Sequence, residues 1–375
     1  MTEIYVIRHA QSEGNLFRMM QGQWDGNITA LGHRQIASLA ERFRDVHLDA
    51  VYSSDLTRTR LTAGAILKYH DLPLHTTKAL REMNLGRWEG CFFGDLAFSE
   101  RDKLLQFITD MQSWELDGAE TSPMVAERTY KELVNIAEEN DGKTVAVVSH
   151  GLAIRCMLWY CLNADLRDTE RNPITTNTGV THLFYKNGKF TCDYINDNSH
   201  LSGIDSPIWG KTADLRGESF DPASDPAFYK SCYESAWMAA HGSTAGFSPM
   251  TYYVSALDHY HADHDAVIRI LDGDKAVGLI DLDTQRGAHA GYGWISLLVL
   301  QEDYRHRGCG IQLLARAMKH YEALGRRAIR LHVAEDNRDA LAFYERWGFR
   351  VIGGESTARG QLLLMEKKFG ENGYV

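Results

Sequence analysis

An apolar run that leads directly into an arginine and a histidine most constrains the fold of this chain. Residues 4–7 (Ile-Tyr-Val-Ile) are typical of a short β-strand, and Arg8 and His9 follow at once, ahead of the polar turn residues 11–15. In α/β sheets, polar residues at the end of a strand lie along the edge where ligands bind. The run therefore predicts an α/β sheet with His9 at its functional edge.

The first two hundred residues alternate strand-like and helix-like patterns. Short apolar runs that end in polar residues predict strands at 3–7, 50–53 and 144–149. Apolar positions three and four residues apart predict helices at 32–44, 58–69, 125–140 and 152–161. This alternation is typical of an α/β sheet covered by helices. Because functional residues gather beyond the carboxyl ends of such strands, we expect His9, Ser54 and His150 to converge on one cleft.

The alternating pattern stops near residues 198–201. The stretch from 202 to 226 holds three of the chain's seven prolines together with several Gly, Ser and Asp residues. We place a domain boundary here and expect a first domain over 1–201 and a second over 210–369. The second half predicts a helix at 226–241, a hairpin at 266–280, a strand at 294–300, a helix at 311–324, a strand at 328–333 and a helix at 338–347.

The length of the chain indicates the number of domains, and its net charge excludes some classes of binding partner. The chain has 375 residues, enough for about two domains, and a formal net charge of −10. Such a charge argues against a nucleic-acid or anionic-membrane partner, because phosphate surfaces select basic proteins. The six cysteines are scattered without a Cys-x-x-Cys pair, which is typical of reduced thiols. Since no apolar stretch approaches the ~18 residues of a membrane span, we expect a cytoplasmic protein.

Three further segments supply the partners that a phosphate-transferring histidine needs. They are residues 53–58 (SSDLTR), 81–90 (REMNLGRWEG) and 147–151 (VVSHG). Phosphoryl transfer requires an in-line nucleophile and fixed positive charge around the phosphate oxygens. A neutral imidazole can attack, arginines and a second histidine can hold the phosphate, and an acid can protonate the departing alkoxide. The residues available for these tasks are His9, Arg8, Arg58, His150 and Glu82.

Together the four segments resemble the histidine phosphatase superfamily, which has a phosphoglycerate mutase-like three-layer α/β fold, over about residues 1–201. The resemblance implies that His9 forms the phosphohistidine and that Glu82 is the proton donor. It also implies a phosphate-binding set of Arg8, Asn15, Gln21, Arg58 and His150. Ala10 replaces the family's usual glycine, which is tolerable unless that backbone takes a positive φ.

The resemblance favours hydrolysis over mutase chemistry. Mutases of the superfamily carry a longer insertion after the acidic segment, whereas the compact segment 86–90 resembles the phosphatase branch. We expect hydrolysis of a small phosphorylated metabolite or a phosphoprotein without a metal, with phosphoglycerate-mutase-type transfer as the alternative. Taken singly, Arg8 could be a surface cation, His150 a core histidine and Glu82 a helix-cap acid. The joint occurrence of the four segments makes these structural interpretations much weaker.

A second candidate site lies in the loop 301–311, between a predicted strand and a predicted helix. Residues 305–310 read Arg-His-Arg-Gly-Cys-Gly. Glycines allow the backbone to approach a pyrophosphate, and a helix N-terminus directs free N–H groups toward it. The segment 337–349, which closes the next strand and opens the next helix, supplies the structural context for a cofactor groove.

The loop and segment 337–349 resemble the GNAT acetyltransferase superfamily, from about residue 210 to 369. The resemblance implies an α+β acyltransferase domain that uses acetyl-CoA and an amine acceptor. It further implies that Tyr344 protonates the leaving thiolate and that residues 298–300 pair with the pantetheine amides. The implied cofactor-binding residues are Leu298, Val299, Leu300, Arg305, Arg307, Gly308, Gly310, Ile311 and Asn337.

The general base of the second domain stays open, with Asp281, Asp283, Glu302 and a water chain as candidates. The segment 258–265 (DHYHADHD) contains metal-ligand residue types, but its irregular spacing and its charge favour a solvated segment over a metal site. The sequence therefore predicts a bifunctional phosphatase and N-acetyltransferase. The alternative for the second domain is a non-catalytic acyl-CoA sensor. The sequence identifies neither substrate nor the oligomeric state.

Overall fold

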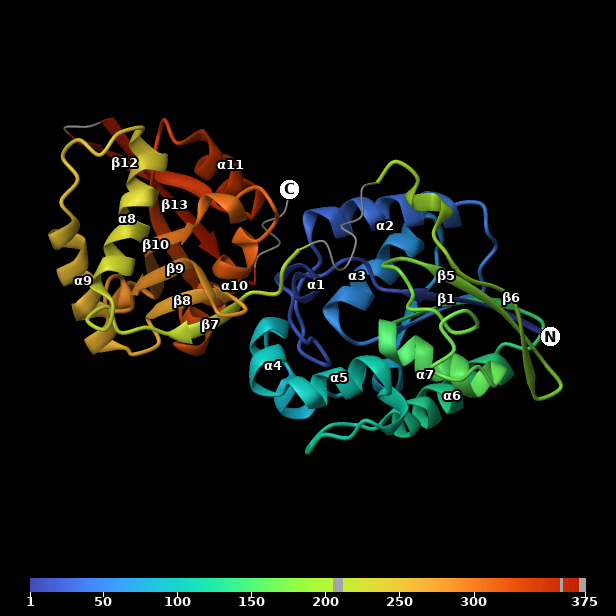
Figure 1. Ribbon diagram of the computed structural model, residues 1–375. Helices are drawn as coiled ribbons and strands as arrows, with labels where there is room; N and C mark the ends of the chain where they lie inside the picture. Colours follow the sequence, from blue (N-terminus) through green and yellow to red (C-terminus); the bar gives the residue numbers. More distant parts are fainter. Residues whose placement is uncertain (205–211, 358–359, 371–375) are drawn as a thin grey trace. The chain divides into compact units, whose positions relative to one another are not determined.

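The structure, a computed structural model, describes residues 1–204, 212–357 and 360–370 (Figure 1). The chain divides into two compact units. The first holds the described residues up to 92 and from 99 to 204, and the second holds residues 93–98 and the described residues after 211. Residues 205–211, which include part of the predicted boundary stretch and the first two residues of the predicted second domain, lie outside the described residues.

A six-stranded sheet organises the first unit, with strand order β3-β2-β4-β1-β5-β6. Strands β1, β2, β3 and β4 are parallel, whereas β5 is antiparallel to both β1 and β6. Parallel strands that share one carboxyl edge are the arrangement that the alternating sequence pattern predicts. The strands are β1 (Thr2–Arg8), β2 (Ala50–Ser54), β3 (Leu74–Thr77), β4 (Thr144–Ser149), β5 (Val180–Lys186) and β6 (Lys189–Asp197).

Helices cover both faces of this sheet, α2 and α3 on one face and α6 and α7 on the other (Figure 1). Alternate residues of β4 serve the two faces: Val145 and Val147 pack with α6 and α7, and Ala146 and Val148 pack with α2 and α3. This explains why β4 is a continuous apolar run. The helices of the unit are α1 (Glu13–Phe17), α2 (Ala30–Phe43), α3 (Thr57–Ile66), α5 (Arg101–Thr109), α6 (Ser122–Glu139) and α7 (Gly151–Leu162).

The β5–β6 hairpin, the edge strand β3 and helix α5 of the first unit lie outside the sequence predictions. The hairpin of β5 and β6 turns at Asn187 and Gly188, whose φ angles are 53° and 75°. Asn-Gly is the dipeptide that favours such two-residue turns, so a signal for this hairpin was present in the sequence. The edge strand β3 has four residues with half-buried or exposed side chains, too few to show an apolar period.

A seven-stranded sheet organises the second unit, with strand order β12-β13-β11-β10-β9-β8-β7. All neighbouring pairs are antiparallel except β10 and β11. Its strands are β7 (Arg216–Ser219), β8 (Val267–Asp272), β9 (Lys275–Asp283), β10 (Tyr292–Leu300), β11 (Ala328–Ala334), β12 (Arg350–Thr357) and β13 (Gly360–Lys368). Its longer helices are α8 (Pro226–His241), α9 (Pro249–Ala262), α10 (Gly310–Ala323) and α11 (Arg338–Arg346).

The predicted elements of this half are confirmed for the helices near 226, 311 and 338, the hairpin and the strands near 294 and 328. The predicted solvated segment at 258–265 is partly helical, since α9 extends to Ala262, and most of its residues are exposed or half-buried as expected. The side chain of His259 on this helix is only 13% exposed. Helix α9 is not predicted because its inward face carries tyrosines and a histidine, so its sequence shows only a weak apolar period.

Helix α4 (Phe93–Ser99) belongs mostly to the second unit, which the sequence pattern does not predict. Residues 93–98 belong to the second unit, although residues on both sides of them belong to the first. Within the second unit, the Asp95 carboxylate accepts two hydrogen bonds of 2.8 Å from Arg316 on α10 and one of 3.0 Å from the Gly217 N–H. The Arg316 side chain is only 7% exposed and that of Asp95 is 35% exposed, so the guanidinium is the buried partner of this pair.

Across the described ranges, none of the helices combines the length and the apolar character that crossing a bilayer requires.

Candidate active sites

Strand register brings the two histidines of the first unit together. Arg8, the last residue of β1, pairs with Ser149, the last residue of β4, in a parallel ladder. The next residues, His9 and His150, therefore leave the same edge side by side, with ring centroids 5.2 Å apart. The Nε2 atom of His150 lies 2.9 Å from the hydroxyl oxygen of Ser54, at the end of β2. The structure thus gathers His9, Ser54 and His150 at one edge, as the sequence pattern predicts.

His9 is held as a neutral imidazole with a defined tautomer. Its Nδ1 lies 2.7 Å from the carbonyl oxygen of Ala10, which can only accept, so Nδ1 carries the proton and Nε2 keeps its lone pair. Burial lowers the pKa of His9 well below 6.5, and the charges of Arg58 and Arg8 act in the same direction. Ala10 is not among the residues with positive φ, so its methyl group costs no backbone strain.

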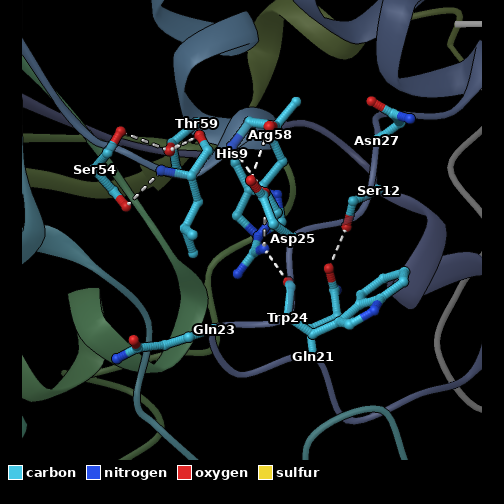
Figure 2. Close-up of polar contacts among 12 residues, drawn as sticks. His9, Ser12, Gln21, Gln23, Trp24, Asp25, Asn27, Ser54, Arg58 and Thr59 are labelled. Atoms are coloured by element: carbon cyan, nitrogen blue, oxygen red, sulfur yellow. Dashed lines mark hydrogen bonds and ion pairs between the residues drawn. The ribbon is translucent and has the colours of Figure 1, made fainter. Parts of the chain in front are cut away.

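Two guanidinium groups flank this histidine, that of the buried Arg58 and that of the half-buried Arg8. Arg58 is 1% exposed and donates to the carbonyl oxygens of Trp24 and Gly22, both at 2.7 Å (Figure 2). Burial lowers the pKa of Arg58 to about 10, so it stays protonated at neutral pH. Arg8 donates through Nη1 to the carbonyl oxygen of Thr175. These carbonyl contacts fix both cations, and the half-exposed Asp25 carboxylate lies 3.9 Å from the Nη1 of Arg58.

Three buried nitrogen atoms of this site have no hydrogen-bond partner among the described residues. They are Nε of Arg8, Nε of Arg58 and Nδ1 of His150. Buried polar atoms in native proteins are nearly always satisfied, so unpaired ones require an explanation. Burial lowers the pKa of His150 well below 6.5, with Arg58 and His9 adding to the effect, so one of its ring nitrogens is unprotonated. A bound anion would give the arginine nitrogens the acceptor that they lack.

Glu82 reaches the same edge from another segment and lies at the N-terminus of α7. Its carboxylate accepts hydrogen bonds from the backbone N–H groups of Ala153 at 2.8 Å, Met83 at 3.0 Å and Leu152 at 3.2 Å. Its side chain is 8% exposed. Burial lowers the pKa of Arg8 and Arg58, and the charge of Glu82 opposes this lowering at both residues.

Asn15 and Gln21 support the site through Ser12. The side-chain oxygen of Asn15 accepts from the N–H and the hydroxyl of Ser12, both at 3.1 Å, and Gln21 lies 2.7 Å from the same hydroxyl. Figure 2 shows the Gln21 side chain directed at Ser12. The structure therefore places Asn15 on α1 and Gln21 in the loop after this helix, where both contact Ser12.

Two residues of the first site are not identified from the sequence. The Asn177 amide donates to the carbonyl oxygen of His9 at 2.9 Å and therefore helps to fix the backbone of this histidine. Arg128 on α6 donates to the carbonyl oxygen of Glu82 at 2.9 Å and forms an ion pair with Glu120 at 2.7 Å. The only sequence signal for Asn177 is a polar turn before an apolar strand. Arg128 lies within an ordinary amphipathic helix and carries no signal at all.

The glycine loop of the second unit has the geometry that an anion-binding loop needs. Gly308 has a φ of 76°, a conformation that side chains disfavour, and it lies in an exposed stretch with Arg307. Gly310 opens α10, and a Cβ on it would come within 3.1 Å of the Phe343 ring. Ile311 is buried in the first turn of the helix. This loop therefore ends in a helix N-terminus at an exposed backbone.

One edge of β10 is open beside this loop. Strand β10 pairs with β11 only from Tyr292 to Trp294, whereas its other edge pairs with β9 as far as Leu300. Residues 298–300 are therefore outside the β10–β11 ladder, as an extended ligand would require. Arg305 donates to the Leu300 carbonyl oxygen at 2.8 Å and to the Ser235 hydroxyl at 2.7 Å, so it braces the start of the loop.

Asn337 and Tyr344 lie on α11. Asn337 is the N-cap of this helix, and its side-chain oxygen accepts from the Ala340 N–H at 3.2 Å. Tyr344 is 9% exposed, and burial raises the pKa of its phenol. Of the three candidate bases, Asp281 is buried against Tyr229 and His259, Asp283 lies 3.5 Å from the same histidine, and Glu302 is exposed.

Comparison with known families decides the identity of the first unit. The profile of the histidine phosphatase superfamily (branch 1) matches residues 4–198, more than half of the chain. The chain belongs to the histidine phosphatase superfamily. His9, Arg8, Arg58, His150 and Glu82 of this histidine phosphatase all lie within the matched range.

Relatives of the histidine phosphatase unit cover about the same segment. A probable phosphoglycerate mutase GpmB of Salmonella choleraesuis (strain SC-B67) is 26% identical over 209 residues, which is 55% of this chain and 97% of the relative. The structure of Bacillus stearothermophilus YhfR is 26% identical and covers 54% of this chain and all of its own, with a TM-score of 0.52. A phosphoglycerate mutase structure from Bacillus anthracis is 27% identical over 54% of this chain and 95% of its own, with a TM-score of 0.48.

The second unit belongs to another family. The profile of the acetyltransferase (GNAT) family matches residues 229–349, which include the glycine loop, β10 and the whole of α11. One chain therefore carries a histidine phosphatase domain and a GNAT domain. The predicted fold class, a phosphoglycerate mutase-like α/β domain followed by an α+β acyltransferase domain, is confirmed.

Proposed function

We propose that the first domain hydrolyses phosphate monoesters through a phosphohistidine on His9. The observation that carries this proposal is the set of unpaired buried nitrogens on Arg8, Arg58 and His150 beside a neutral His9. Phosphate oxygens would satisfy both guanidinium groups at once. The Nε2 lone pair of His9 would attack the phosphorus, since Nδ1 is occupied by the Ala10 carbonyl oxygen.

Glu82 would handle the protons of both half-reactions. As the ester bond breaks, its carboxylic acid would protonate the departing alkoxide. In the second half, the carboxylate would take a proton from water, which attacks the phosphorus and releases His9. The amide donors at the start of α7 hold this carboxyl group in one place for both steps. The positive charge that the reaction needs comes from the two arginines, so we propose that no metal is required.

We further propose that the GNAT domain transfers an acetyl group from acetyl-CoA to an amine. Its residues fit this ligand: the exposed Gly308 backbone has positive φ, Gly310 opens α10, and the edge of β10 near residues 298–300 is open. Acetyl-CoA, when bound, would supply the acetyl group as a reactive thioester. Arg307, Gly308, Gly310 and Ile311 would hold its pyrophosphate, and residues 298–300 would hold its pantetheine arm. Tyr344, whose pKa is raised by burial, would keep its proton until a thiolate leaves.

A substrate screen with the intact chain tests the phosphatase assignment. We expect hydrolysis of p-nitrophenyl phosphate and of a subset of small phosphorylated metabolites or phosphopeptides, unchanged by EDTA. Interconversion of 3- and 2-phosphoglycerate faster than phosphate release would instead favour mutase chemistry, and loss of activity with EDTA would contradict the metal-free mechanism.

Calorimetry with acetyl-CoA tests the second assignment. We expect saturable binding of acetyl-CoA and release of free CoA when an acceptor amine is present. Binding without transfer to any amine would favour an acyl-CoA sensor, and the absence of binding would contradict the proposal.

A further inference from the structure

A histidine and an aspartate of the GNAT domain form a mostly buried pair. The Nδ1 of His259, on α9, lies 2.6 Å from one carboxylate oxygen of Asp281, on β9. The other oxygen accepts a hydrogen bond of 2.8 Å from the phenol of Tyr229, on α8. Asp281 is 1% exposed, whereas the His259 side chain is 13% exposed. The aspartate is therefore fixed from two sides, and the imidazole is the partly accessible member of the pair.

Strand register places this pair near the reactive end of the proposed cofactor groove. The pyrophosphate loop follows the carboxyl end of β10, so a pantetheine arm along residues 300 to 298 would point its thioester back toward Leu297. Leu297 pairs directly with Asp281 across the β10–β9 ladder, next to a register shift between Ile295 and Leu297. Opposed residues of an antiparallel pair point to the same face of a sheet. Leu297 and Tyr229 lie in one apolar cluster, so this is the face that α8 covers.

We propose that His259 is the general base of acetyl transfer and that Asp281 is its positioning residue. This inference rests on the proposed acetyltransferase function and names the group that the sequence leaves open. The hydrogen bond from Nδ1 to Asp281 fixes the tautomer of the neutral ring, so Nε2, which lies 3.5 Å from the Asp283 carboxylate, is the atom that takes up a proton.

The proposed step balances in protons and bonds. Nε2 of His259 takes one proton from the acceptor ammonium group, and the neutral amine then attacks the thioester carbon. A C–N bond forms, the C–S bond breaks, and the thiolate receives its proton from Tyr344. The amine nitrogen sheds its second proton to solvent as the amide forms, His259 returns its proton to water, and solvent restores the phenol proton of Tyr344.

The charges around the imidazole set the pH range of this step. Burial by itself lowers the pKa of His259, but the hydrogen bond and charge of Asp281, with the charges of Asp283 and Asp258, outweigh it and raise the pKa above 6.5. Tyr229 faces the same carboxylate from α8 as a neutral phenol, because burial raises its pKa. His259 is therefore protonated and inactive as a base at acidic pH, so transfer should rise with pH through this raised pKa.

The test compares His259→Asn with the matched variant His261→Asn in the intact chain, since His261 is an exposed histidine on the same helix. The acceptors are spermidine, lysine amide and tyramine, which are ammonium ions at neutral pH, and hydroxylamine, which is mostly unprotonated there. We expect His259→Asn to reduce kcat/KM about 100-fold or more with the ammonium acceptors, within the range of general-base catalysis. With hydroxylamine the loss should be less than about tenfold, and His261→Asn should match the wild type with all acceptors.

An NMR titration of the protein without acetyl-CoA supplies a second measurement. We expect the His259 ring to titrate above 6.5 in the wild type and at lower pH in Asp281→Asn, because a neutral amide replaces the charge. A structural pair that only anchors α9 would give equal losses with all four acceptors and an unchanged pH profile, which would overturn the inference. Wild-type transfer with full activity in His259→Asn would overturn the inference alone. If the wild type acetylates none of the amines, both this inference and the proposed acetyltransferase function fail.

Discussion

The rings of His9 and His150 lie 5.2 Å apart because the residues that precede them, Arg8 and Ser149, pair in the parallel β1–β4 ladder. Because the two strands are parallel, both end at the same edge of the sheet, and the histidine that follows each strand lies at that edge. Burial lowers the pKa of both histidines, and the charges of Arg58 and Arg8 lower it further, which keeps both rings neutral. The nucleophile and its neighbour are thus positioned by backbone hydrogen bonds.

Replacing the nucleophile should abolish turnover. We expect His9→Ala to lower p-nitrophenyl phosphate hydrolysis by about 10⁴-fold or more, because no other group can form the covalent intermediate. Rapid quenching of the wild type with labelled substrate should trap acid-labile phosphate on His9. The control is His47→Ala, whose side chain is 82% exposed. Substantial activity in His9→Ala would contradict the phosphohistidine mechanism.

Neutral buried histidines should make the first domain sensitive to acid. His9 and His150 have pKa values well below 6.5 in the folded state and about 6.5 when unfolded, so the unfolded chain binds more protons below pH 6.5. Stability should be full above about pH 6.5 and fall below it, by up to about 1.4 kcal/mol per pH unit for each histidine. Urea titrations of wild type and His150→Asn over pH 5–7.5 measure this. The variant should show a shallower decline, and identical slopes would contradict the assignment.

The role of Glu82 should depend on the leaving group. We expect Glu82→Gln to slow hydrolysis of alkyl phosphates by about 10²-fold or more, since an alkoxide needs a proton as it departs. An activated aryl ester should lose much less in the phosphorylation step. A plot of rate against leaving-group pKa should therefore be steeper for the variant. Parallel plots for the two proteins would show that Glu82 is not the acid.

Gly308 should control acetyl-CoA affinity. We expect Gly308→Glu to weaken binding by about tenfold or more, because a negative side chain would face the pyrophosphate. Gly325→Glu is the matched control, since Gly325 also has positive φ, at 68°, but lies beyond the other end of α10. Tyr344→Phe should retain binding and lose turnover. Calorimetry that gives the same affinity for both glycine variants would contradict the cofactor loop.

The Asp95–Arg316 pair should contribute strongly to the stability of the second unit. Asp95→Asn removes a carboxylate charge beside a guanidinium that is only 7% exposed, so we expect a loss of about 2 kcal/mol. Arg316→Met removes the buried charge itself and leaves the more exposed Asp95, so it should cost less. A fragment of residues 205–375 lacks Asp95 and should melt below the second unit of the intact chain. Equal melting of fragment and intact chain would contradict this.

Many elements of both domains can be predicted from the sequence, because each depends on the order of residues within one short segment. The strand that ends in Arg8 and His9, the glycine loop before α10 and the helix near 338 are each contained in one short segment. The period of the apolar residues, or the spacing of the glycines and charged residues, is then sufficient to predict the element. The hairpin at Asn187 and Gly188 belongs to the same class, since its turn dipeptide is a local signal.

Only the tertiary structure decides which distant residues meet. Three hydrogen bonds are made by residues in segments that carry no motif of their own. They link Asn177 to the His9 carbonyl oxygen, Arg128 to the Glu82 carbonyl oxygen, and His259 to the Asp281 carboxylate. The membership of residues 93–98 in the second unit is of the same kind. The sequence by itself determined the two folds and the chemical groups at the ends of their strands, because backbone periodicity and turn chemistry are local. The partners of those groups depend on packing between distant elements, which no single segment encodes.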